Sequence, residues 1–218
     1  MATILMTLAE KKAPRSYEWL INLLTFGRRI RIFKYIKFNY LQEDQLLLDA
    51  GCGNCRFIEI ADTSWVNPIG VDISERMLQQ AREKFVGRKF NPHLIQTSIT
   101  NIPMRIETFD IVICTLVFSE LDHHQVKRSL REFFNCLKKN GLLILVTESK
   151  PNSRLKHYVI SLLRIPAFLL AVIIAKVPRH PIHDIKAILR DHPGKLLEEK
   201  SYLGGHLSLF VIRKMDKL

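Results

Sequence analysis

The pattern of apolar and polar residues in the middle of the chain alternates between two periods. Short, nearly unbroken apolar runs predict strands, and they fall at residues 46–49, 69–72, 93–96, 109–114 and 142–147. Between them, apolar residues recur every three or four positions, which predicts helices at 57–61, 75–84 and 126–139. Strands that alternate with helices predict an α/β fold, with a mostly parallel sheet and helices on both faces.

The two ends of the chain follow other patterns. Residues 14–41 mix aromatic, aliphatic and basic residues at helical spacing, which predicts one or two amphipathic helices broken near Gly27. This segment either packs on the domain or forms a lid over a ligand. At the other end, residues 182–190 predict a helix, and 198–203 with 206–213 predict two closing strands that form a hairpin.

Residues 158–177 form the most apolar segment, and basic residues border it on both sides. Arg164 and Pro166 leave an uninterrupted apolar run of 11 residues, 165–175, whereas about 20 are needed to span a bilayer. A membrane span is therefore disfavoured. Three alternatives remain open, namely a buried cap helix, a helix lying at a membrane surface, and a helix lining a pocket for a lipid-like substrate.

Length and charge define the predicted organisation. The 218 residues suit one domain, which we divide into a helical lid at 1–45 and a main domain at 46–218 with an apolar insert at about 151–181. The formal net charge is +12, and it is concentrated in the ends, because the central residues 46–150 carry 13 basic and 12 acidic side chains. An anionic partner, such as a membrane surface contacted through residues 155–179, would therefore meet the flanks rather than the centre.

The four cysteines do not suggest a disulfide framework in a chain of this length. Cys52 and Cys55 have the spacing of a redox pair or half a zinc site, but no second pair of this spacing follows, so we predict no metal. The N-terminus lacks the charge order of a secretory signal. We expect a cytoplasmic protein that can associate with a membrane.

The clearest candidate binding motif is the stretch of residues 46–56, LLLDAGCGNCR. An apolar run leads through Asp49 into a turn with Gly51 and Gly53 and then into a predicted helix, an arrangement that lets backbone approach a nucleotide. Asp72 ends the next apolar run, 19 residues after Gly53. At that spacing a carboxylate can accept hydrogen bonds from the ribose hydroxyls of an adenosine-type cofactor.

These residues, together with three further motifs, resemble the class I S-adenosylmethionine-dependent methyltransferases. LLLDAGCGNC is similar to the first family motif, IGVDISERML to the second, SITNIPMRIETFDIVICTLVFSEL to the adenine-site loop and fourth strand, and LKKNGLLILV to the fifth strand. The resemblance implies a Rossmann-like, seven-stranded sheet with a terminal antiparallel hairpin. Two positions depart from the pattern, because Cys55 replaces the third glycine and Ser98 stands where the family often has an acid.

The resemblance also implies S-adenosyl-L-methionine as the cofactor and a set of residues that contact it. These residues are Asp49, Ala50, Gly51, Cys52, Gly53, Asp72, Ile73, Met77, Ser98, Ile99, Thr115 and Leu116. Methyl transfer needs a base only where the acceptor must lose a proton. Candidates are Tyr17 in the N-terminal segment and Glu120, His123 and the neighbouring His124 after the fourth strand.

The acceptor is predicted from what surrounds the shared motifs. The proline-containing motif of many nucleic-acid and protein amine methyltransferases is absent from CTLVFSEL, and an apolar insert follows the fifth strand. We therefore predict a methyltransferase for a hydrophobic small molecule or lipid, such as a phospholipid head group or quinone precursor, at or near a membrane surface. The alternatives are an RNA methyltransferase, consistent with the basic flanks but with no visible RNA-binding module, and a non-catalytic subunit that binds the cofactor and stabilises a partner.

Overall fold

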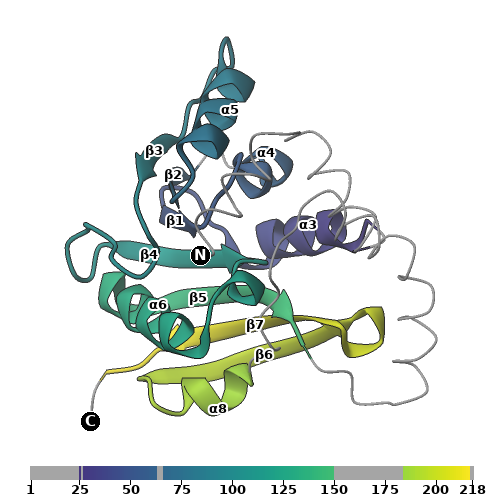
Figure 1. Ribbon diagram of the computed structural model, residues 1–218, viewed down its shortest axis with the longest axis vertical. Helices are drawn as coiled ribbons and strands as arrows, with labels where there is room; N and C mark the ends of the chain where they lie inside the picture. Colours follow the sequence, from purple (N-terminus) through teal and green to yellow (C-terminus); the bar gives the residue numbers. More distant parts are fainter. Residues whose placement is uncertain (1–24, 26, 63–65, 150–183, 217–218) are drawn as a thin grey trace.

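A computed structural model describes residue 25 and residues 27–62, 66–149 and 184–216 (Figure 1). Most of the predicted N-terminal lid, including Tyr17, and the whole apolar insert at 151–181 lie outside the described residues. In the part of the chain that is described, no helix is long and apolar enough to cross a membrane.

The predicted sheet has seven strands in the order β3-β2-β1-β4-β5-β7-β6. The first five strands run parallel, and β7 runs antiparallel to both β5 and β6, which confirms the predicted topology. The strands are β1 (Leu46–Ala50), β2 (Asn67–Asp72), β3 (His93–Gln96), β4 (Phe109–Thr115), β5 (Leu137–Glu148), β6 (Gly194–Tyr202) and β7 (Leu207–Lys214).

Helices cover both faces of the sheet (Figure 1). One apolar core contains side chains of α6 (His123–Cys136) and α8 (Ile185–Leu189), and the other contains those of α3 (Arg28–Tyr40), α4 (Arg56–Ala61) and α5 (Glu75–Phe85). In β5, Leu143 and Leu145 face the first core, whereas Ile144 and Val146 face the second. This alternation is why the central strands read as unbroken apolar runs.

Helix α3 is the described part of the predicted N-terminal helical segment. It begins directly after Gly27, whose φ of 67° is left-handed, so the predicted break falls where the helix starts. Its inner side is buried against the domain, and the rings of Phe33 and Phe57 meet edge to face with centroids 5.2 Å apart. Such a contact joins α3 firmly to α4.

The predicted helix at 126–139 is correct in type but wrong at its end. Helix α6 ends at Cys136, and Leu137 is already extended and paired with Phe109 of β4. The last carbonyls of the helix accept hydrogen bonds from the backbone N–H groups of Glu107 and Thr108, at 2.9 and 2.8 Å. These donors lie in a distant loop and satisfy the helix end, so the pattern of residues 126–139 alone could not reveal the boundary.

The terminal hairpin is confirmed, with one boundary moved. Strand β6 begins at Gly194 rather than at residue 198, and it is the outermost strand of the sheet. Its first residues, Lys195 and Leu196, are exposed and show no apolar alternation, because an edge strand packs less completely than a central one. A short 3₁₀ turn, η2 (Leu203–Gly205), joins it to β7.

Candidate cofactor and active site

The glycine turn lies against the ends of β2 and β4. The backbone N–H groups of Gly51 and Cys52 both donate to the carbonyl of Val71, at 2.8 and 3.0 Å. Gly51 has a φ of 76°, and a Cβ there would overlap the side chain of Val117. Gly53 also has a left-handed φ of 53°, but a Cβ there would meet nothing within 4 Å. One glycine is thus required by the protein's own packing, whereas the other borders open space.

Cys55 takes the backbone conformation that glycine adopts most easily. It is the N-cap of α4, with φ 58° and ψ 37°, and its side chain is fully buried. The departure from glycine at this position therefore preserves the left-handed geometry of the turn. A hydrogen bond with Cys55, together with burial, raises the pKa of the Cys52 thiol well above its ordinary value.

Asp72 joins the turn to the start of α5. One carboxylate oxygen accepts from the backbone N–H of Gly53 and the other from that of Ser74, each at 2.8 Å. These two hydrogen bonds fix the orientation of the side chain beside the glycine turn.

Asp49 is a buried acid in β1. Its side chain is buried, and neither carboxyl oxygen has a hydrogen-bond partner among the described residues. Burial and then the charge of Asp72 raise the pKa of Asp49 to about 8. Because an orphaned buried acid is costly, this arrangement fits a site completed by a donor or cation that binds there.

The second predicted part of the cofactor site lies around the end of β2. Ser74 caps α5, accepting from the N–H of Met77 at 3.2 Å. Met77 itself is half-buried, whereas the neighbouring Leu78 is buried in the core. Ile73 is 51% exposed directly after Asp72, so it offers an apolar surface beside the predicted ribose position.

The predicted adenine loop is tied to this strand end. The N–H of Thr97 donates to the carbonyl of Asp72 at 2.9 Å. Ser98 forms a hydroxyl–hydroxyl hydrogen bond with Thr100 at 2.8 Å, and Ile99 is buried in the core. The structure therefore brings Asp72 and Ser98 to the same edge of the sheet.

The end of β4 and the residues that follow it include two predicted cofactor contacts and three of the predicted catalytic candidates. Thr115 ends the strand, and Leu116 follows with a left-handed φ of 62° and donates its N–H to Val146, at 2.7 Å. Glu120 is half-buried in the short 3₁₀ helix η1 (Phe118–Glu120), whereas His123 and His124 are exposed in the first turn of α6. Tyr17 cannot be placed relative to them, because it lies outside the described residues.

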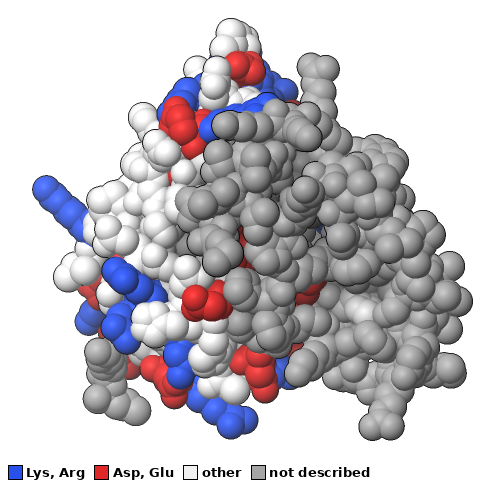
Figure 2. Space-filling view, viewed as in Figure 1, with Lys and Arg blue, Asp and Glu red and all other residues white. Residues whose placement is uncertain are grey.

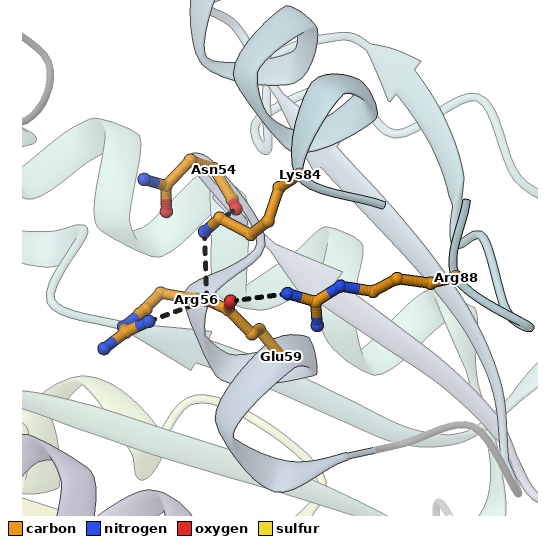
Figure 3. A network of polar contacts seen from close by, with 5 residues as sticks. All are labelled: Asn54, Arg56, Glu59, Lys84 and Arg88. Carbon is orange, nitrogen blue, oxygen red and sulfur yellow. Dashed lines mark hydrogen bonds and ion pairs between the residues drawn. The ribbon is translucent and has the colours of Figure 1, made fainter. Parts of the chain in front are cut away.

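A network of charged side chains that we did not predict connects α4, α5 and the glycine turn (Figure 3). Glu59 of α4 forms ion pairs with Arg56, Lys84 and Arg88, at 2.7, 3.2 and 3.1 Å. Burial alone would raise the pKa of Glu59, but the hydrogen bond from Arg56 and the charge of Lys84 hold it below its ordinary value. Lys84 also donates to the carbonyl of Asn54 at 2.8 Å, which ties α5 to the glycine turn.

Only one part of this network had a signal in the sequence. Arg56 and Glu59 are three residues apart at the start of α4, next to the predicted helix 57–61, and this spacing favours ion pairs on a helix. Lys84 lies 30 residues from Asn54, and their contact depends on how the two helices pack. Within the described ranges, no group of three or more histidine, cysteine or acidic side chains is arranged to hold a metal ion.

Comparisons with known proteins find similarity to methyltransferases. Residues 48–145 match a family described as "Methyltransferase domain". The ubiquinone/menaquinone biosynthesis C-methyltransferase UbiE of Syntrophotalea carbinolica is 32% identical over 152 residues, covering 68% of this chain and 62% of that protein. UbiE of Campylobacter jejuni is 27% identical over 146 residues, covering 62% of this chain and 60% of that protein.

A solved structure gives the same fold. Magnesium protoporphyrin IX methyltransferase (ChlM) from Synechocystis PCC 6803, with bound SAH, superposes with a TM-score of 0.65 at 16% identity. The match covers 87% of this chain and 84% of that one. Since the identity is low, this likeness is one of fold.

The seven-stranded sheet, the glycine turn followed by Asp72, and the family match together define a nucleotide-cofactor fold of the methyltransferase type. Over residues 48–145 the chain is similar to the class I S-adenosylmethionine-dependent methyltransferases, and this similarity implies S-adenosyl-L-methionine as the cofactor. It spans about three fifths of the length of the curated relatives it matches.

Proposed function

We propose that this protein transfers a methyl group from S-adenosylmethionine to a hydrophobic small molecule, of the quinone-precursor or lipid type, at or near a membrane surface. The observation that carries the first part is the fixed Asp72 carboxylate beside the open backbone of Gly53. The acceptor class is supported by the relatives that are described as ubiquinone/menaquinone C-methyltransferases.

In this proposal each side of the turn binds a different part of the cofactor. Asp72 accepts from the ribose hydroxyls, and Ile73, Met77, Ser98 and Ile99 enclose the adenine. The backbone of 49–53, with Thr115 and Leu116, lies along the methionine part, where the buried Asp49 receives a positively charged or donor group. When bound, the cofactor supplies a methyl group on a sulfonium, which is already activated for transfer.

The remaining work of the protein is positioning and exclusion of water, since methyl transfer is an in-line displacement. An acceptor carbon or oxygen that must lose a proton also requires a base. We retain Glu120 and His123, with Tyr17, as candidates for that role. Their places after β4 and in the N-terminal segment make them testable one at a time.

Calorimetric titration with the demethylated cofactor, S-adenosylhomocysteine, tests the cofactor site. We expect Asp72→Ala to lower affinity by more than tenfold, from a loss of ~1.5–3 kcal/mol in charge-assisted hydrogen bonds. Because Asp72 also holds the turn, Gly53→Ala and Gly87→Ala form a second, matched pair. Both positions have a left-handed φ and open space for a Cβ, so each variant carries a similar strain of about 1 kcal/mol.

Only Gly53→Ala should also weaken cofactor binding, because only there must the backbone approach the ligand. Equal affinity in the two glycine variants, with no loss in Asp72→Ala, would remove the cofactor assignment. The acceptor is tested by transfer of labelled methyl groups to a detergent-dispersed demethylated quinol, compared with bulk tRNA. Labelling of tRNA alone would overturn the proposed acceptor class.

A further inference from the structure

Helix α3 has one side whose long side chains are exposed. Its buried side consists of Arg29, Ile32, Phe33 and Ile36. On the opposite side of the helix, Arg31, Lys34 and Phe38 follow each other at spacings of three and four, so they form one continuous stripe. All three are exposed, and Phe38 is 78% exposed, which makes it the most exposed large apolar side chain in the described residues.

Among the described residues, the cations of this stripe are not paired with acids. Helix α3 has five basic residues and no acidic one. Lys37 lies 3.9 Å from Asp62, but Arg31 and Lys34 have no ion-pair partner within the described ranges. By contrast, cations and acids lie close together over α6 and α8 in Figure 2, where Lys127 pairs with Asp191 and Lys186 with Glu199.

We propose that the stripe of Arg31, Lys34 and Phe38 docks the protein on an anionic phospholipid bilayer. A row of cations with an aromatic ring among them suits a planar interface, where the cations meet head groups and the ring enters the boundary of the acyl region. The inference rests on the proposed function, in which the acceptor lies at a membrane surface. It assigns that contact to described residues, whereas the predicted contact at 155–179 lies outside them.

The position of α3 makes the docking useful for the proposed reaction. Through the Phe33–Phe57 contact, α3 packs directly on α4, whose N-cap Cys55 belongs to the glycine turn. The stripe therefore lies on a helix that packs against the helix following the cofactor turn. A lipid-dissolved acceptor would reach the site without leaving the vicinity of the surface.

Vesicle co-sedimentation of the full chain, without cofactor or acceptor, tests the proposal. We expect binding to phosphatidylcholine vesicles that contain about one third phosphatidylglycerol and little binding to phosphatidylcholine alone. The variant Arg31→Gln/Lys34→Gln should lower the partition coefficient roughly 25-fold, about fivefold for each cation. The matched control Arg128→Gln/Arg131→Gln removes the same charge from exposed positions of α6 and should change it by less than about twofold.

Phe38→Ser supplies an independent variant, because it leaves the charge unchanged. It should reduce the part of the binding that persists at high salt. The proposal would be overturned if the two charge variants lost vesicle binding equally, or if the protein bound bulk tRNA in preference to vesicles. Methyl transfer to a detergent-dispersed acceptor is measured in parallel, so a protein that methylates but does not bind vesicles refutes the docking surface and leaves the proposed chemistry intact.

Discussion

At the scale of single residues, we expect Asp49 to lower the stability of the free protein and to contribute to cofactor binding. A buried carboxylate without hydrogen-bond partners destabilises the protein when it is charged. In the proposed complex, a cationic or donor group of the cofactor would offset that cost. Sites that bind ligands through strained or unsatisfied groups are expected to trade stability for function.

The pH dependence of stability should reveal Asp49. Its pKa is about 8 in the folded protein against an ordinary value of 3.8, so between these pH values the folded state retains a proton that the unfolded chain has lost. Stability therefore falls as pH rises through this window. Asp49→Asn should remove the fall and raise the free energy of unfolding at pH 8 by ~2–5 kcal/mol, measured by urea denaturation without cofactor.

The same variant should bind S-adenosylhomocysteine more weakly, because the acid has been lost from the methionine end. Asp44→Asn is the matched control, since Asp44 is exposed and asparagine tolerates its left-handed φ of 61°. It should leave both the pH profile and the affinity unchanged. If Asp49→Asn proved less stable than the parent at pH 8, the charged carboxylate would have to be stabilised by groups beyond those found around Asp49 in the described residues.

Single residues also mark where the sequence was informative. Gly51, Gly53 and Asp72 could be found because left-handed backbone and a ribose-binding carboxylate restrict residue type and spacing. The conformation of Cys55 could not be predicted, since a cysteine rarely adopts positive φ and nothing local indicates it. The lack of hydrogen-bond partners around Asp49 depends on how three strand ends pack and has no signature in the sequence.

At the scale of elements, α6 has a complete capping box. Asp122 accepts from the N–H of Gln125 at 2.8 Å, and the side chain of Gln125 accepts from the N–H of Asp122 at 3.0 Å. This cap fixes the point where the chain leaves the end of β4 and turns back over the sheet. It therefore sets the positions of the candidates Glu120 and His123.

Asp122→Ala should lower the free energy of unfolding by about 1 kcal/mol, since the backbone N–H of Gln125 loses its side-chain acceptor. Urea denaturation measures the change. His124→Ala is a control in the same turn, because His124 is exposed and takes no part in the cap. We expect a change of less than about 0.5 kcal/mol there, and equal losses in the two variants would show that the cap contributes nothing specific.

The type of each helix or strand was easier to predict than the residues at which it begins and ends. The apolar stripe of α6 and the apolar run of β5 identified both elements, yet the transition at Leu137 was missed. It is set by pairing with Phe109 and by donors from Glu107 and Thr108, which are remote in sequence. For the same reason β6 was recognised but begins earlier than expected, since its first residues pair with the end of β7 without an apolar pattern.

At the scale of the whole molecule, the seven-stranded sheet with its terminal antiparallel hairpin followed from the family resemblance, whereas the attachment of α3 did not. Tyr35 donates to Glu198 of β6 at 2.8 Å, Tyr40 also donates to Glu198, and Lys200 pairs with the same carboxylate at 2.7 Å. The tyrosines lie about 160 residues from Glu198 along the chain. This cluster of Tyr35, Tyr40, Glu198 and Lys200 joins the first described helix to the last edge strand.

The charge of Glu198 should control how firmly α3 is held. Burial would raise its pKa, but hydrogen bonds from Lys200, Tyr40 and Tyr35 hold it below its ordinary value. For an acid with a lowered pKa, the stabilisation is present above the unfolded pKa and is lost as pH falls through the folded value. Glu198→Gln should therefore cost about 1 kcal/mol at pH 7 and less at pH 3.

Hydrogen exchange resolved by residue locates that loss. Amides of α3 should lose protection in Glu198→Gln, while those of β1 and β4 change only by the global difference in stability. Glu199→Gln is the matched control, because the neighbouring acid is more exposed and pairs with Lys186 of α8 rather than with α3. If both variants leave the protection of α3 unchanged, the apolar contacts of Ile32, Phe33 and Ile36 are sufficient to hold the helix, and the polar cluster is not what orients its membrane-facing stripe.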